Sequence, residues 1–163
     1  MPITIREANR DEWETLIPLL LLAEHSERGL RWGLEHLIDA AYRMDDNDQL
    51  VGTATLRWRD DPCEIQELAI VAERQGQGLG RQMIAWLIEE AKRRGKTHML
   101  VGTANASIGN IAFYQKVGFR VDHVRHDYFW YYDEPVYENG IRVLDMIVFR
   151  YDLVPQPHTR RRR

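Results

Sequence analysis

With 163 residues, of which 44% are hydrophobic, the chain is long enough to bury one core but too short for two full domains. Its net charge is −3, and because the last four residues are arginines, the remainder of the chain carries −7. This acidic body suits a cationic substrate and argues against a nucleic-acid-binding groove. We predict a single domain over residues 1–153, followed by a disordered basic tail over residues 154–163.

Cysteine content and hydropathy exclude several other classes of protein. Cys63 is the one cysteine, so an internal disulfide is excluded, and no Cys/His cluster indicates a metal site. The longest apolar run, residues 16–23, contains Pro18 and is too short to cross a membrane. Charged residues precede this run, unlike the basic start of a signal peptide. We expect a cytoplasmic protein with no metal and no membrane or nucleic-acid partner.

Hydrophobic periodicity in the first half of the chain predicts strands mixed with two helices. Asn9 or Asp11 can cap the first helix, and Pro18 would kink it. The polar residues 46–48 form the turn between two strands. In chain order, the expected elements are a strand at 3–7, helices at 12–22 and 28–41, and strands at 42–44, 50–58 and 63–71.

The second half begins with the most regular helix of the chain, residues 79–94, which Gly95 ends. The side chains on its apolar face are expected to pack on the sheet and are Leu79, Met83, Ile84, Leu87, Ile88 and Ala91. The elements expected after it are a strand at 98–103, a helix that carries Asn110 and Tyr114, and strands at 119–124 and 143–151, with an aromatic connection at 128–137.

Three alternate glycines, Gly76, Gly78 and Gly80, lie between the strand pattern at 65–71 and the helix at 79–94. A glycine-rich turn lets successive backbone N–H groups point inward, and the N-terminus of the following helix adds roughly half a positive charge. Such a site stabilises a phosphate or pyrophosphate group without a lysine. The loop therefore predicts a phosphate-bearing ligand.

Spacing excludes two common families of phosphate-binding loop. The Walker loop needs Gly-Lys-Ser/Thr, whereas Arg81 and Gln82 follow the last glycine here. The dinucleotide fingerprint needs two residues between its second and third glycines, whereas Leu79 alone separates them. That fingerprint also needs an acidic residue at the end of a second strand, and Glu89 and Glu90 lie inside the helix. Neither nucleotide hydrolysis nor nicotinamide or flavin binding is predicted.

Two motifs in this order are typical of the GNAT superfamily of acetyl-CoA-dependent N-acetyltransferases. There, a strand ending in Leu-Ala-Val/Ile leads into a Gln/Arg-x-x-Gly-x-Gly/Ala loop, and a later helix carries Asn and Tyr before Gly-Phe. The matching residues are Leu68, Ala69, Ile70, Gln75, Gly78 and Gly80 in the first motif, and Asn110, Tyr114, Gly118 and Phe119 in the second. The chain resembles this superfamily over most of residues 3–151. Segments 102–107, 138–141 and 145–147 resemble a bacterial subgroup of unassigned substrate.

The resemblance implies a mixed α/β (α+β) fold with a central, mostly antiparallel, twisted sheet and a splayed pair of parallel strands at the cofactor site. It implies acetyl-CoA as co-substrate, without a metal. By resemblance, the cofactor-binding residues are Leu68, Ala69, Ile70, Gln75, Gly76, Gln77, Gly78, Leu79, Gly80, Arg81, Asn105, Asn110, Phe113 and Tyr114. Arg81 could contact phosphate or be solvated, and Asn105 could touch the cofactor or only turn the chain.

The chemistry that the resemblance implies requires a neutral amine. With a lysine-like pKa of about 10.4, roughly one amine in 2,500 is neutral at pH 7, which is equivalent to about 4.6 kcal/mol. Glu67 and Glu64 are the candidate bases, with Glu67 preferred because it adjoins the expected thioester position. Strand alternation places them on opposite faces unless a bulge intervenes. Tyr114 is the candidate acid for the departing thiolate.

The acceptor is expected to be the primary amine of a small molecule, which attacks directly in a ternary complex. His25, Ser26 and Glu27 and the aromatic, acidic segment 128–138 should flank the acceptor mouth. Trp130 and its neighbours could equally form a homodimer surface. A protein or peptide acetyltransferase that modifies lysine or an N-terminus, and a non-catalytic acyl-CoA-binding or sensing domain, are the alternatives.

Overall fold

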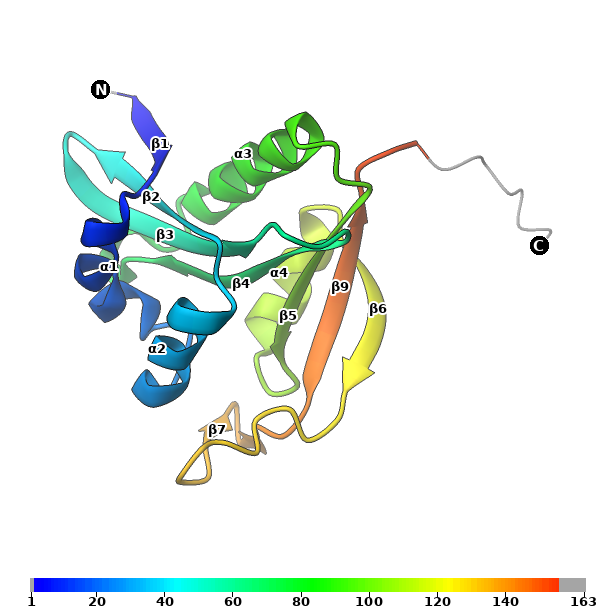
Figure 1. Ribbon diagram of the computed structural model, residues 1–163. Helices are drawn as coiled ribbons and strands as arrows, with labels where there is room; N and C mark the ends of the chain where they lie inside the picture. The colour runs from blue at the N-terminus through cyan, green and yellow to red at the C-terminus, as the bar shows by residue number, and fades with distance from the viewer. Residues whose placement is uncertain (1, 156–163) are drawn as a thin grey trace.

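The computed structural model describes residues 2–155; most of the predicted tail, residues 156–163, lies outside the described part of the chain. Seven strands form one twisted sheet in the order β1-β2-β3-β4-β5-β9-β6 (Figure 1). Only β4 and β5 pair in parallel, so the predicted mixed α/β fold with a mostly antiparallel sheet is confirmed. The strands are β1 Ile3–Glu7, β2 Ala40–Asp46, β3 Gln49–Arg57, β4 Cys63–Ile70, β5 His98–Ala104, β6 Arg120–Arg125 and β9 Met146–Asp152.

Helices lie against both faces of the sheet. Adjacent residues of β2 belong to different cores: Tyr42 packs in the cluster that contains α3, whereas Ala41 packs in the cluster that contains α1 and α2. This is the alternation expected of a strand that is covered on both faces. The helices are α1 Trp13–Leu20, α2 Glu27–His36, α3 Leu79–Arg93 and α4 Ile108–Lys116, with short 3-10 turns at Arg10–Glu12 and Ala72–Arg74. None of the helices within residues 2–155 is both long and apolar enough to cross a membrane.

The α3 helix provides the centre of the larger core. Its buried side chains are those that the sequence periodicity predicts, namely Leu79, Met83, Ile84, Leu87, Ile88 and Ala91. They pack against inward-facing residues of β2, β3 and β4. Because the glycine loop leads directly into this helix, the same packing fixes the position of its N-terminus.

The contribution of the apolar face of α3 to stability can be measured by truncating one of its side chains. Leu87→Ala should lower the free energy of unfolding by about 3 kcal/mol, because the side chain is fully buried and its removal leaves a cavity. Urea unfolding followed by circular dichroism would report the change. Leu144→Ala, at a position that is 42% exposed, is the control and should cost less than about 1 kcal/mol. Equal losses for the two variants would contradict the assignment of α3 to the core.

Two strand features shape the site. The parallel β4–β5 pair has only three paired rows, Cys63–Ile65 with Met99–Val101, whereas β5 pairs with β9 over seven rows. Beyond Ile65 the strands therefore diverge. Within β4, Thr55 pairs with Glu67 while Leu56 pairs with Ile65, so Gln66 is an extra residue in a β-bulge. The bulge offsets the alternation and brings Glu64 and Glu67 to the same face of the sheet.

Several predicted boundaries are corrected by long-range pairing. The second helix was expected to continue to Ala41, but α2 ends at His36, and Ala40 and Ala41 pair with β3. The first helix is also shorter than predicted, at Trp13–Leu20. The last strand begins at Met146 rather than at residue 143. Between β6 and β9 the chain forms an unpredicted hairpin of β7, Tyr137–Glu138, and β8, Ile141–Arg142.

Candidate active site

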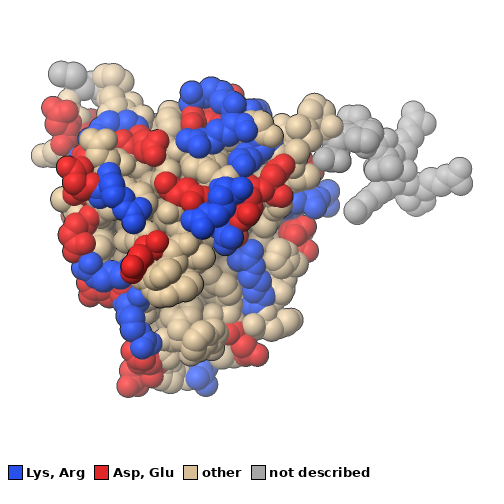
Figure 2. Space-filling model, viewed as in Figure 1, with Lys and Arg blue, Asp and Glu red and all other residues tan. Residues whose placement is uncertain are grey.

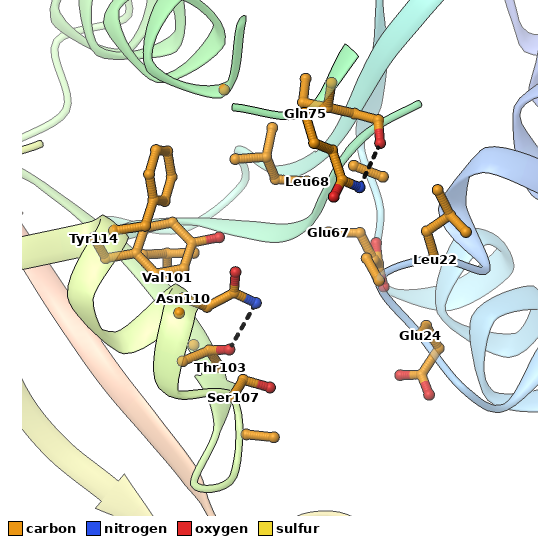
Figure 3. A pocket seen from close by; sticks show the side chains of 18 of the residues that line it. Leu22, Glu24, Glu67, Leu68, Gln75, Val101, Thr103, Ser107, Asn110 and Tyr114 are labelled. Atoms are coloured by element: carbon orange, nitrogen blue, oxygen red, sulfur yellow. Dashed lines mark hydrogen bonds between the residues drawn. The ribbon is translucent and has the colours of Figure 1, made fainter. Parts of the chain in front are cut away.

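A cavity of about 860 Å³ lies where β4 and β5 diverge (Figure 3). One wall comes from β4 and the segment after α1, and the opposite wall comes from β5 and α4. The predicted site residues that line it are Glu67, Leu68, Ala69, Ile70, Gln75, Gly76, Gly78, Leu79, Gly80, Arg81, Asn110, Phe113 and Tyr114. The sequence motifs, which are far apart in the chain, therefore meet at one cavity.

The glycine loop and the start of α3 form one end of this cavity. Gly76 and Gly78 have positive φ angles of 76° and 83°, which glycine adopts without the strain that a Cβ atom would bring. Gln82 N donates to Gly78 O at 3.0 Å, so the amides of the first helical residues before Gln82 have no acceptor within the helix. Gln75 Nε2 donates to Ile70 O at 3.0 Å and holds the loop against β4 (Figure 3). This end of the cavity can bind an anion.

The third glycine lies in a close contact. A Cβ atom on Gly80 would lie 3.3 Å from Cζ of Phe113, so a larger residue there would have to displace the Phe113 ring by a few tenths of an ångström. Gln77 differs from the other loop residues. Its Oε1 accepts from Arg74 Nε at 2.9 Å, and it is not among the residues that line the cavity. Arg74 in turn pairs with Asp46 at 2.8 Å.

Tyr114 projects from α4 into the cavity, and its hydroxyl points toward the wall formed by β4 (Figure 3). Its ring packs against Phe113, Phe119 and Phe149, with ring centroids 5.2 to 5.9 Å apart. Burial raises the pKa of the phenol above its ordinary value. The hydroxyl therefore keeps its proton throughout the physiological pH range and can serve as a proton donor.

Glu67 faces the cavity from the opposite wall (Figure 3). The Thr55 hydroxyl donates to its carboxylate, and Glu67 N donates to Thr55 Oγ1 at 3.0 Å, so the side chain is held in one orientation. Burial raises the pKa of Glu67 to about 7, opposed by the Thr55 hydrogen bond and assisted by the charges of Glu24 and Glu64. A carboxyl group with this pKa can accept a proton near neutral pH.

Glu64, the second candidate base, has another partner. Arg125 forms two contacts with its carboxylate, at 2.9 and 3.3 Å, and Glu64 does not line the cavity. The bulge at Gln66 therefore puts both glutamates on one face, but Arg125 neutralises the first of them. The geometry favours Glu67 as the group that exchanges a proton in the cavity.

The two predicted asparagines differ in position. Asn110 lies one helical turn before Tyr114 and lines the cavity, where its Nδ2 donates to Thr103 Oγ1 at 3.3 Å (Figure 3). Asn105 does not line the cavity. Its Oδ1 accepts from the backbone N–H groups of Leu144 and Asp145, and its Nδ2 donates to Arg142 O at 3.0 Å. Asn105 therefore connects the end of β5 to the segment before β9.

The segment after α1 and the aromatic connection form the other end of the cavity. Of the three residues expected there, only His25 lines it; Ser26 caps α2, accepting from Gly29 N at 3.0 Å, and Glu27 pairs with Arg31 at 3.2 Å. The lining residues that the motifs did not indicate include Glu24, Thr103 and Ser107. The sequence offered one signal for Glu24, namely that it is a loop carboxylate next to the residues predicted to flank the acceptor mouth.

The aromatic connection is fixed against α2 and the preceding loop. Tyr131 Oη donates to Glu24 Oε2 at 2.8 Å, and Arg28 contacts Asp133 at 3.2 Å. Phe129 and Tyr132 line the cavity, whereas Trp130 is 84% exposed and borders a separate hollow of about 320 Å³. On the molecular face in Figure 2, basic and acidic side chains are interspersed. No group of three or more His, Cys, Asp or Glu side chains within residues 2–155 is arranged to hold a metal ion.

Comparisons with known proteins agree with this geometry. Residues 4–119 match the acetyltransferase (GNAT) family. A curated relative in Bacillus subtilis strain 168, the uncharacterized N-acetyltransferase YvbK, is 37% identical over 153 residues, which cover 93% of this chain and 96% of the relative. The structure is similar to an IAA acetyltransferase from Bacillus cereus ATCC 14579, with a TM-score of 0.83, 30% identity, and coverage of 93% of this chain and 99% of the other.

A second solved structure is a GNAT family acetyltransferase from Elizabethkingia anophelis with acetyl-CoA bound. It superimposes with a TM-score of 0.82 and 32% identity, over 92% of this chain and 97% of the other. The family match covers well over half of the chain, and the curated relative is similar over nearly its whole length. This chain therefore belongs to the GNAT family of N-acetyltransferases.

Proposed function

We propose that this protein transfers the acetyl group of acetyl-CoA to the primary amine of a small molecule, by direct attack of the amine in a ternary complex. The observation that carries the proposal is the continuity of one cavity. It joins the anion-binding N-terminus of α3 to the two proton-exchanging side chains, Glu67 and Tyr114. A single bound molecule could thus have its phosphates at one end and its reactive group between these side chains.

The residues at the α3 end fit the chemistry of acetyl-CoA. Free amide groups and the helix dipole match a pyrophosphate, and Arg81 beside them adds a positive charge. The edge of β4 that faces the cavity has no paired strand beyond Ile65 among the described residues. The backbone groups of Leu68 and the N–H of Ile70 are therefore available to the amide groups of a pantetheine arm, whereas Ile70 O already accepts from Gln75 Nε2. When bound, acetyl-CoA supplies the activated acetyl group.

Glu67 and Tyr114 divide the proton transfers between the two walls. Glu67, with a pKa of about 7, takes the proton from the incoming ammonium group, directly or through water, and leaves it nucleophilic. Tyr114, whose pKa is raised by burial, keeps its proton until the thiolate leaves. No covalent enzyme intermediate is proposed, because burial raises the pKa of Cys63, the one cysteine, to about 12 and leaves the thiol inert.

The acceptor end favours a small molecule over a peptide chain. Tyr131 reaches across to Glu24, and its ring lies so close to Gly29 that a Cβ atom there would be 2.8 Å from Tyr131 Cε2. His25 Nε2 and Glu138 Oε1 approach to 3.2 Å across the same mouth. These contacts connect the aromatic segment to α2 and reduce the space that an extended peptide would need.

The test is acetyl-CoA turnover, followed by release of the free thiol, against polyamines, aminoglycosides, amino acids and lysine peptides. We expect amine-dependent thiol release with at least one small amine, and mass spectrometry should find the added acetyl group on that amine. Turnover on lysine peptides alone would instead support a protein-modifying enzyme. Tight binding of acetyl-CoA without turnover on any acceptor would support a sensing domain and contradict the proposal.

A further inference from the structure

The acceptor end of the cavity carries carboxylates that no arginine or lysine side chain balances. Glu24, Glu67 and Glu138 all line the cavity. None of them forms an ion pair with an arginine or lysine within the described residues; Glu138 Oε1 lies 3.2 Å from His25 Nε2. Glu64, just outside, is by contrast paired with Arg125. The cavity therefore concentrates carboxylates at the place where an amine must enter.

Glu24 is held in place by neutral donors. Ser26 N donates to its Oε1 at 2.9 Å, and the Tyr131 hydroxyl donates to its Oε2 at 2.8 Å. These hydrogen bonds orient the carboxylate without cancelling its charge, and they fix it on the same side of the cavity as Glu67 (Figure 3). Phe129 and Tyr132 line the same end and add aromatic surface that suits an organic cation.

The arginine and lysine residues that line the cavity are Arg74, Arg81 and Lys116, and they lie toward its other end. Arg74 precedes the glycine loop and pairs with Asp46. Arg81 follows Gly80 at the start of α3. Lys116 lies on α4, three residues after Phe113, and the ring of Phe113 lies beside Gly80. The cavity is thus polarised, with cationic groups at the anion-binding end and carboxylates at the acceptor end. One carboxylate, Glu67, is assigned to the reacting amine, so Glu24 is left for a second positive charge.

On the basis of the proposed function, we propose that the acceptor is an organic dication: one primary amine reacts beside Glu67 while a second cationic group pairs with Glu24. A monoamine would leave Glu24 without a counter-ion in the partly buried cavity, and an amino acid would bring its own carboxylate against three others. Short diamines, longer polyamines and other polyamino compounds belong to the class; monoamines and zwitterions do not.

The test compares putrescine, butylamine and γ-aminobutyrate, which share chain length and primary amine and differ in the charge at the far end. We expect kcat/KM for putrescine to exceed that for butylamine at least about tenfold, well beyond the twofold that its two equivalent amines contribute. γ-Aminobutyrate should be the poorest of the three. The longer diamine cadaverine, run beside putrescine, reports the preferred distance between the two charges.

The decisive variant is Glu24→Gln, which removes the charge but keeps the shape of the side chain. Its amide oxygen can still accept from Ser26 N, and its amide NH2 can donate to the Tyr131 hydroxyl, which rotates to accept. The ratio of kcat/KM for putrescine to that for butylamine should fall to about two, the statistical value. Glu27→Gln makes the same change of charge three residues away, outside the cavity, and should keep the wild-type ratio. Circular dichroism and acetyl-CoA binding would establish that both variants are folded.

Different outcomes separate this inference from the function on which it rests. A wild-type ratio of two or less, a preference for γ-aminobutyrate, or an unchanged ratio in Glu24→Gln would overturn the dication and leave the acetyltransferase intact. Absence of thiol release with these acceptors and with the whole amine panel would instead contradict the proposed function itself.

Discussion

Tyr114→Phe should lower kcat at least about tenfold, because the loss of the hydroxyl removes the proposed proton donor to the departing thiolate. The benzene ring remains, so the packing against Phe119 and Phe149 is retained and the fold is preserved. The measurement is thiol release at saturating acetyl-CoA and amine, together with calorimetric binding of acetyl-CoA. We expect the dissociation constant for acetyl-CoA to change less than about threefold, because general acid catalysis acts on the chemical step.

Tyr137→Phe is the matched control for Tyr114→Phe. Tyr137 is 62% exposed and lies outside the cavity, so the kcat of the Tyr137→Phe variant should equal that of the unmodified protein. If Tyr114→Phe turned over at the wild-type rate, the phenol would have only a packing role and another proton donor would be needed. If neither the unmodified protein nor Tyr114→Phe turned over any amine, the acyl-CoA-sensing alternative would gain support.

Glu67→Gln should remove the acidic limb of the pH–rate profile. With a pKa of about 7, wild-type Glu67 is protonated below neutral pH and cannot accept a proton, so kcat/KM should rise with pH through about 7 and then level off. In Glu67→Gln the limb near pH 7 should vanish, and the rate on the plateau should fall about a hundredfold. Glu64→Gln, which breaks the Arg125 pair, should keep the limb; its loss there would identify Glu64 as the base.

Glu67→Gln should also change how the free energy of unfolding depends on pH. The folded-state pKa of Glu67 is raised above its unfolded value of about 4.5, so its contribution to stability is fully present below that value and is lost as pH rises through about 7. Glu67→Gln carries no such titration. Between pH 5 and pH 8 the variant should therefore gain about 1–3 kcal/mol relative to the wild type, measured by urea unfolding.

Local sequence patterns predicted the parts of the fold that depend on neighbours in the chain. The alternate glycines and the apolar face of α3 follow from backbone freedom and helical periodicity, and both are found as expected. Asn110 and Tyr114, four residues apart, reach the same cavity because one helical turn separates them. These relations lie within one element, so the sequence alone determines them.

Long-range contacts account for the features that were missed. Ala40 and Ala41 are good helix formers, yet pairing with β3 makes them a strand. The bulge at Gln66 depends on the register between β3 and β4, which no local pattern reports. Asn139-Gly140 is a strong hairpin signal that would have located β7 and β8. The homodimer surface and the roles of the individual cofactor contacts stay predictions.

The short β4–β5 contact separates the sheet into two halves that face each other across the cavity. One carries Glu67 and the glycine loop and the other carries Tyr114. Three paired rows of backbone and the core around α3 hold the halves together. A molecule bound across the crevice contacts both halves, so its binding should raise the free energy of unfolding of the protein. If Glu67 and Tyr114 act as we propose, the base and the acid lie on opposite halves of the sheet, so the reaction depends on how the two halves are placed relative to each other.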